Sequence, residues 1–320
     1  MKHQTKTRIE DRSTFPSLPV WAQSAPPRAP ETVAFRSGAS LSVLDAALRD
    51  PAAGVPLKLL ANTLALRAAT ATSKLEGRLA RECDIRDAFH LTPPGEARGP
   101  DGDLLAFWRD AARLRLGSTN WRTRLCEIGG VTDGADIDTW LDEAVHHAGA
   151  YGPLSGCARI LRAVLSADDR AERLACLLSD VVLARALSWK AVLPTTAQRQ
   201  TKAGLRALVA DESAANVAVQ ARLLESVHET ITLARELALR AAALTQIAPK
   251  LRSKASDAAI DLFLAQDAIA PSSMLSPTIH GTNIAMTDRA ARRLCSRLVD
   301  LGVARELTGR STFRLYGIGP

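Results

Sequence analysis

Six polar side chains near the C-terminus carry the clearest chemical signal in this sequence. They are Arg289, Arg292, Arg293, Ser296, Arg310 and Arg314. Guanidinium groups bind phosphates and the edges of bases, and a serine hydroxyl adds further hydrogen bonds. The first four fall on one side of a helical wheel drawn for residues 288–301. We therefore predict that this segment contacts duplex DNA.

An amphipathic helix followed by a hairpin must position these side chains. Thr287 suits the N-cap of the helix, and Gly302 ends it. The predicted core side of this helix consists of Ala291, Leu294, Leu298 and Leu301. Two short strands, 303–307 and 313–318, are expected to follow. Their predicted inward-facing residues are Val303, Leu307, Phe313 and Leu315.

A further helix is predicted at 255–268, and a loop rich in serine and proline separates it from the helix at 288–301. The order helix, loop, helix and hairpin is that of a winged helix, a variant of the helix-turn-helix. Such a module also docks protein partners, and in that case the arginines would only solvate its surface. The sequence leaves this second interpretation open.

The remaining reactive side chains lack the spacing that catalysis or metal binding requires. The cysteines lie far apart, at Cys83, Cys126, Cys157, Cys176 and Cys295. His146 and His147 are adjacent on a predicted helix, so their side chains point about 100° apart. The sequence contains no G-x-S-x-G, H-E-x-x-H, P-loop or G-x-G-x-x-G motif. We predict no catalytic residue, no metal and no cofactor.

Within residues 33–250, charged residues are densest at 74–87. Arg78, Glu82 and Arg86 follow one another at a spacing of four, which predicts ion pairs on a solvated helix face. A buried acid–base pair is the alternative.

The formal net charge of +7 is concentrated at the two ends of the chain. Residues 1–36 carry +3 and residues 281–320 carry +4, whereas the residues between them are neutral overall. A localised basic excess is typical of a surface that binds a polyanion. For the N-terminal end we favour a solvated basic tail.

The composition predicts a mainly α fold. Of the 320 residues, 47% are hydrophobic but only 4% are aromatic, and alanine and leucine are the best helix formers. We expect a disordered, proline-rich arm at 1–32, an all-helical body at 33–250 and a winged-helix domain at 255–320. The absence of a long uncharged apolar run and of a secretory signal favours a cytoplasmic protein that does not span a membrane.

One long helix is predicted at 213–247, where neither proline nor glycine occurs. It would span roughly 50 Å. Val217, Leu224, Val227 and Ile231 follow a spacing like that of a coiled coil, so a homodimer seam is one alternative. Packing of this helix within its own bundle is the interpretation that we favour.

The C-terminal run MTDRAARRLCSRLVDLGVARELTGRSTFRLYGI, residues 286–318, resembles the winged helix that follows the catalytic domain of many Fic-type proteins. The catalytic motif of Fic proteins is absent, so the resemblance does not imply adenylylation. Most of residues 33–318 is similar to an uncharacterised, often plasmid-borne bacterial family of alanine-rich helical proteins. The matching stretches are SGASLSVLDAAL (37–48), LALRAATATSKLEGR (64–78), IRDAFHLTPPG (85–95) and the C-terminal run.

Together these observations predict a non-enzymatic DNA-binding protein with a regulatory or plasmid-maintenance role. The alternative is a structural adaptor whose winged helix docks a protein partner, as in chromosome- or plasmid-partition complexes. The helical body with a C-terminal winged helix resembles the architecture of kleisin-type partition subunits. A third hypothesis is an enzyme with an unrecognised helical active site.

Overall fold

The computed structural model describes residues 15–23, 29–93, 95–132, 134–210, 213–251, 254–310 and 312–319. Within these ranges the chain is mainly helical, which confirms that the fold is mainly α. Strands β1 (Arg305–Glu306) and β2 (Tyr316–Gly317) pair in an antiparallel two-stranded sheet. No helix in the described part of the chain is long and apolar enough to cross a membrane.

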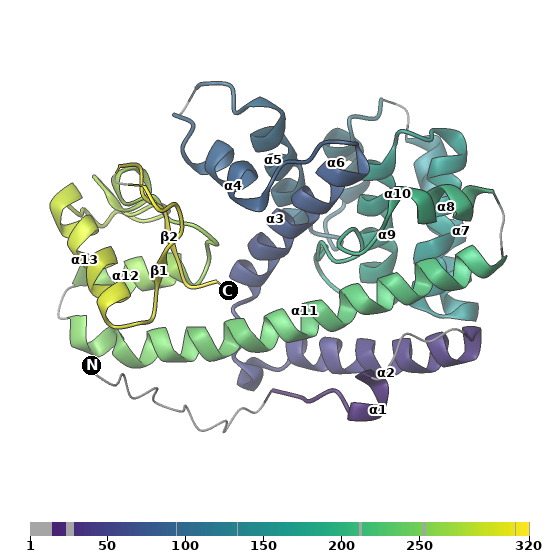
Figure 1. Cartoon of the computed structure of the whole chain (residues 1–320), viewed down its shortest axis with the longest axis horizontal. Helices are drawn as coiled ribbons and strands as arrows, with labels where there is room; N and C mark the ends of the chain where they lie inside the picture. The colour runs from purple at the N-terminus through teal and green to yellow at the C-terminus, as the bar shows by residue number, and fades with distance from the viewer. Residues whose placement is uncertain are drawn as a thin grey trace.

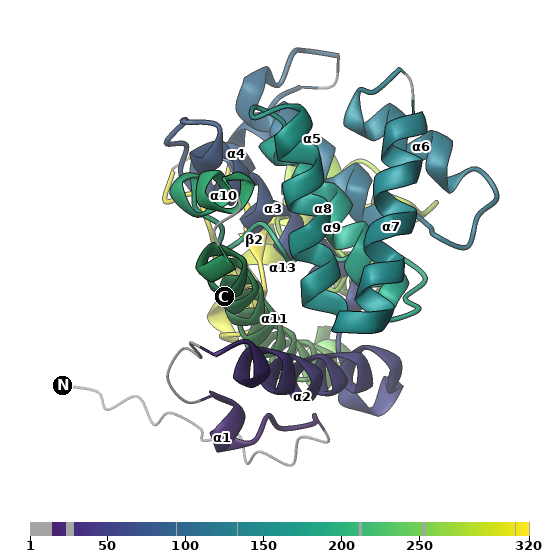
Figure 2. The ribbon, with the colours of Figure 1, turned by 90° about the vertical axis from the view of Figure 1, so that its right-hand side faces the viewer.

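The helices before residue 210 pack in small groups. They are α1 (Val20–Gln23), α2 (Pro30–Arg49), the 3-10 turn η1 (Pro51–Ala53), α3 (Leu57–Leu75), α4 (Glu82–His90), α5 (Gly99–Arg113), α6 (Trp121–Gly129), α7 (Ala135–Tyr151), α8 (Pro153–Ala167), α9 (Glu172–Ala186) and α10 (Lys202–Val209). Helices α7, α8 and α9 lie side by side, and α3 packs against α4 and α5 (Figure 2). Leucine and alanine fill the contacts between them.

Helix α11 (Ser213–Ile247) extends along several other helices of the molecule. Its 35 residues correspond to about 50 Å, and it runs along one side of the structure with α2 beside it (Figure 1). It also contacts α3, α8 and α10. Leu224, Val227 and Ile231 of the predicted seam are buried within this chain. The predicted long helix is therefore present, and its own chain covers much of its apolar face.

The C-terminal segment follows at one end of α11 (Figure 1). It contains the 3-10 turn η2 (Ala248–Leu251), α12 (Lys254–Phe263), a π-helical turn η3 (Pro271–Leu275), α13 (Asp288–Asp300) and the two strands. Phe263, Ile269, Cys295 and Tyr316 belong to the same continuous cluster of buried apolar residues as the helices of the body.

The N-terminal arm is described only in part. Residues 1–14 and 24–28, on which the prediction of disorder also rests, lie outside the described residues. Phe15 and Ala22 are buried. Trp21 of α1 stacks on Phe35 of α2, with 5.2 Å between the ring centroids.

The sequence pattern at 169–193 predicts a single helix, but α9 ends at Ala186. Ser188, two residues later, adopts the left-handed conformation with φ of 55°. Residues 192–197 are buried although they are not helical. The carboxylate of Asp180 accepts hydrogen bonds from the backbone N–H groups of Thr195 and Thr196, at 2.9 and 2.8 Å. The two backbone N–H groups, which would bond to carbonyl oxygens in a helix, are therefore satisfied by this side chain.

Candidate nucleic-acid interface

Helix α13 separates an apolar side from a basic side. The Thr287 hydroxyl accepts a hydrogen bond from the Ala290 N–H at 3.3 Å, which confirms the predicted cap. Ala291, Cys295 and Leu298 are fully buried. Four of the side chains predicted to bind DNA are exposed on the other side, namely Arg289, Arg292, Arg293 and Ser296.

The buried side of α13 is rotated slightly from the predicted one. Leu294 and Leu301, which we predicted to lie in the core, are only partly buried, whereas Cys295 is fully buried. The predicted core side contains only alanine and leucine, but an unreactive cysteine also packs as a small apolar side chain. Burial raises the pKa of the Cys295 thiol to about 12, so this group stays protonated and uncharged.

The hairpin is shorter than predicted and its turn is held by Glu306. This carboxylate accepts hydrogen bonds from the Thr308 N–H at 2.7 Å and the Gly309 N–H at 2.9 Å. Burial alone would raise the pKa of Glu306, but a hydrogen bond from the Thr308 hydroxyl and the two backbone N–H groups hold it below its usual value. The prediction that Phe313 points inward is wrong: it is 75% exposed, because residues 312–314 precede β2 and Phe313 has φ of 55°.

The tip of the hairpin contacts the body through α4. Arg310 forms an ion pair with Asp87 at 3.1 Å, and Arg86 binds the same carboxylate at 2.9 Å. Arg86 also donates a hydrogen bond to the Leu307 carbonyl oxygen at 3.0 Å. Arg314 remains exposed, and its Nε donates to the Arg310 carbonyl oxygen at 2.9 Å. Arg310 and Arg314 therefore lie together on the hairpin, and Arg310 also contacts α4.

A buried charge cluster joins the C-terminal segment to α4 and α5. Arg109 of α5 forms an ion pair with Asp267, which follows α12, and both side chains are almost fully buried. The Nε2 atom of His90 lies 3.0 Å from the guanidinium of Arg109. Burial alone would raise the pKa of Asp267, but Arg109 and His90 hold it below its usual value. The carboxylate therefore stays charged and ties the two parts of the chain together.

The charge cluster at 74–87 is paired differently from the prediction. Helix α3 ends at Leu75 and α4 begins at Glu82, so Arg78 and Glu82 do not share a helix. Arg78 instead pairs with Glu76 and with Asp101, each at 3.1 Å. Arg86 is in the same helix as Glu82 but turns toward Asp87 and the hairpin. Because the Arg86 side chain points inward, it joins α4 to the distant hairpin and does not form the predicted surface ion pair with Glu82.

The histidine pair shows no metal-binding arrangement. His147 lies 3.0 Å from the Ser155 hydroxyl, and His146 is exposed. Across the described residues, no group of three or more His, Cys, Asp or Glu side chains is arranged to hold a metal ion. Burial raises the pKa of the Cys157 and Cys176 thiols, so these two cysteines remain protonated.

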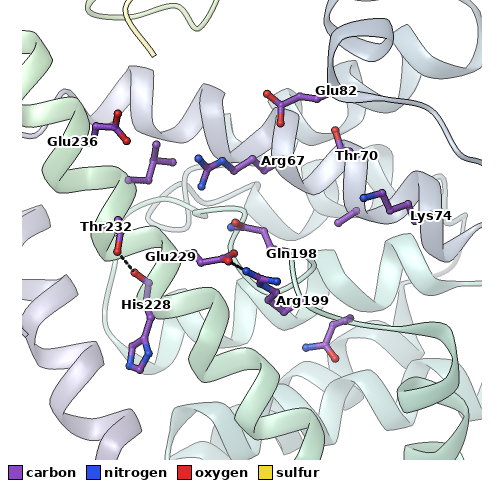
Figure 3. Close-up of a pocket in the computed structure, with 13 residues that line it drawn as sticks. Arg67, Thr70, Lys74, Glu82, Gln198, Arg199, His228, Glu229, Thr232 and Glu236 are labelled. Atoms are coloured by element: carbon purple, nitrogen blue, oxygen red, sulfur yellow. Dashed lines mark hydrogen bonds and ion pairs between the residues drawn. The ribbon is translucent and has the colours of Figure 1, made fainter. Parts of the chain in front are cut away.

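The sequence does not predict the pockets of the molecule, and two of them have several charged side chains in their lining. The first, of about 560 Å³, lies between α3, α11 and the loop before α10 (Figure 3). Its lining includes three basic and three acidic side chains, Arg67, Lys74, Arg199, Glu82, Glu229 and Glu236. Arg199 pairs with Glu229, so part of this charge is cancelled within the pocket. The second pocket is lined by residues of α2, α3 and α5 and by residues 188–193.

No sequence signal identifies these pockets, because their walls come from segments that are distant in the chain. In the first, α3 supplies Arg67 and Lys74 whereas α11 supplies Glu229 and Glu236. Their proximity depends on the packing of α3 against α11. A helical wheel for either helix alone does not show it.

Fold and surface together define a mainly helical protein with a small C-terminal hairpin and an exposed basic helix. The chain belongs to the family described as a protein of unknown function, DUF1403, and the match covers residues 6–318. No curated protein matches this sequence. The resemblance to an uncharacterised family is thereby confirmed.

Proposed function

We propose that this protein binds duplex DNA through the exposed face of α13. The observation that carries the proposal is that this helix has one exposed basic side and one buried apolar side. Three arginines and a serine face solvent, and Ala291, Cys295 and Leu298 hold the opposite side in the core. A helix anchored by one side and basic on the other is suited to the major groove. We further propose a regulatory or plasmid-maintenance role.

The order of the C-terminal elements supports a winged-helix interpretation of this segment. Ile269, between α12 and η3, forms two backbone hydrogen bonds with Tyr316 of β2, at 2.8 and 2.9 Å. The succession is therefore helix α12, one paired residue, the turn η3, helix α13 and the hairpin β1–β2. In a winged helix, a short extended segment between the first two helices pairs with the second strand of the hairpin, as Ile269 does here. The helix before the hairpin, here α13, enters the groove.

Arg310 and Arg314 would act as the wing. Arg310 is 56% exposed in its side chain but pairs with Asp87, whose side chain is only 13% exposed. Contact with a phosphate would require Arg310 to leave this carboxylate. We therefore assign the first contacts to α13, where Arg292 pairs with Asp288 at 2.9 Å and both side chains are exposed, so that the pair contributes little to stability.

Charge reversal on α13 tests the proposal. Arg289→Glu with Arg292→Glu should abolish binding of the full-length protein to a fluorescent duplex, because two attractive contacts become repulsive. Fluorescence anisotropy at several salt concentrations is the measurement. Four phosphate contacts per chain would give a log–log salt slope of about −3.6. Thermal melts should agree within about 0.5 kcal/mol, since both side chains are exposed.

The matched control is Arg170→Glu with Arg206→Glu. Both side chains are exposed on other helices or loops, and the pair changes the net charge equally. This control should retain most of the DNA affinity. Absent binding by the folded wild-type protein, or equal loss in both double variants, would reject the interface on α13. The adaptor hypothesis, in which the same segment docks a protein partner, would then take its place.

A further inference from the structure

The second pocket lies where the body meets the segment that leads to the C-terminal elements. It measures about 740 Å³, a volume typical of small-molecule sites. The end of α2, the start of α3, the end of α5, residues 188–193 and the two residues Ala265 and Gln266 line it. We call it the basic pocket.

The charge of the basic pocket has one sign. Its lining includes five basic side chains, Arg49, Lys58, Arg113, Arg115 and Lys190, and no acidic side chain is among the residues that line it. Arg49 is engaged by Asp45 at 2.7 Å, and Arg113 by Asp110 at 3.2 Å. Within the described ranges, Lys58, Arg115 and Lys190 have no ion-pair partner. Three cations are therefore free to bind an anion.

Part of the lining of the basic pocket is apolar. Val192 is buried, and Trp189, Ala61 and Ala112 are partly buried. Leu57 is 50% exposed, although it is a large aliphatic side chain. Covering such a surface with an apolar ligand removes it from water, which favours binding.

Backbone pairing fixes the two segments that carry Arg115 and Lys190. Arg115 and Ala191 form an antiparallel bridge, and the Leu116 N–H donates to the Lys190 carbonyl oxygen at 3.0 Å. This pairing brings the end of α5 beside the segment that follows α9. Ser188, at the rim, has φ of 55°, a conformation that costs energy for any residue with a side chain. The early end of α9 thus creates the wall of the pocket.

We propose that the basic pocket binds a small organic anion that has an apolar body and a carboxylate or phosphate head group. The head lies among Lys58, Arg115 and Lys190, and the body covers Leu57, Trp189 and Val192. The first pocket has no such character, because its acidic and basic side chains are equal in number. This inference does not depend on DNA binding.

Isothermal titration calorimetry of the full-length protein tests the proposal with a matched set of probes. Decanoate or decyl phosphate should bind with one site per chain, and the comparison of these two identifies the preferred head group. Decylammonium, with the same chain and the opposite charge, should not bind. Acetate should bind at least about a hundredfold more weakly than decanoate, because each buried methylene contributes about 0.8 kcal/mol.

Two variants connect the binding to this pocket. Lys58→Gln with Lys190→Gln should raise the Kd of the preferred anion about tenfold or more, since hydrogen bonds to charged groups are lost. Leu57→Asn should weaken decanoate but leave acetate unchanged. Arg170→Gln with Arg206→Gln is the control and should leave every Kd unchanged. All substituted side chains are exposed or half-exposed, and circular dichroism melts verify folding.

The outcomes separate cleanly. If neither decanoate nor decyl phosphate binds at one site per chain, the proposal is wrong. Equal binding of decylammonium, or an unchanged Kd in the double lysine variant, would also reject it. A Kd that rises only in the pocket variants supports it.

Discussion

At the scale of single residues, Asp180 is a carboxyl group in an environment that disfavours its charge. It is fully buried, and one of its oxygens accepts the N–H groups of Thr195 and Thr196. The other oxygen has no hydrogen-bond partner among the described residues. Burial raises the pKa of Asp180 to about 7, despite the hydrogen bonds that favour the anion.

The raised pKa predicts a stability that falls with pH. Between about pH 4 and pH 7 the native carboxyl keeps a proton that the unfolded chain releases, so the native state loses roughly 1.4 kcal/mol per pH unit from this group. Above pH 7 the loss is complete. Asp180→Asn removes the titration, so the difference in unfolding free energy between wild type and variant should change across this interval. Urea unfolding at pH 5, 6, 7 and 8 measures it, and parallel profiles for the two proteins would contradict the prediction.

At the scale of elements, the contact between α7 and α8 depends on Gly156. A Cβ atom built there would lie 2.6 Å from the Ala148 Cβ and 2.7 Å from the Ala144 carbonyl oxygen. These distances are too short for any side chain, and the closest atoms belong to the neighbouring helix. The two helices approach each other only because residue 156 has no side chain.

Gly156→Ala should therefore destabilise the protein by about 1–3 kcal/mol, because the helices must separate. Gly149→Ala is the control: this residue is exposed in α7 and nothing lies within 4 Å of its Cβ position. It should stabilise the helix by up to about 1 kcal/mol. Thermal unfolding of both variants is the measurement. A Gly156→Ala variant as stable as wild type would mean that α7 and α8 are not closely packed.

Elements of regular periodicity could be predicted from the sequence, and contacts between distant segments could not. The cap Thr287, the apolar repeat and the terminal Gly302 predict helix α13 from the sequence. The end of α9 was missed because four of the five residues in Trp189–Leu193 are apolar, as in a buried helix, and nothing local specifies the left-handed Ser188. The pairing of Arg310 with Asp87 was missed for a different reason: helical wheels carry no information about tertiary neighbours.

At the scale of the whole molecule, a large apolar cluster and the buried ion pair of Arg109 with Asp267 both join the C-terminal segment to the rest of the chain. Apolar residues before and after residue 250 belong to one cluster. The predicted division between a body at 33–250 and a domain at 255–320 stays a prediction. A shared core makes separate unfolding of the two parts costly.

We expect the wild-type protein to unfold in one cooperative thermal transition. Asp267→Asn should lower stability by about 3–5 kcal/mol, because Arg109 is left buried without a counter-charge. Asp110→Asn, which removes an exposed partner of Arg113, should change it by less than about 1 kcal/mol. Differential scanning calorimetry distinguishes the cases. Two transitions in the wild type would establish the C-terminal segment as an independent folding unit.

The uninterrupted length of α11 also restricts how the gene can change in length. Each inserted residue turns everything beyond it by about 100° and advances it by about 1.5 Å. Arg240, near the far end of α11, donates hydrogen bonds to the carbonyl oxygens of Ile318 and Gly319, at 3.2 and 2.9 Å, and such a turn would break them. Among members of this family, insertions and deletions should therefore avoid the interior of α11. Any that occur there should add or remove whole helical turns, because only these restore the direction in which Arg240 points.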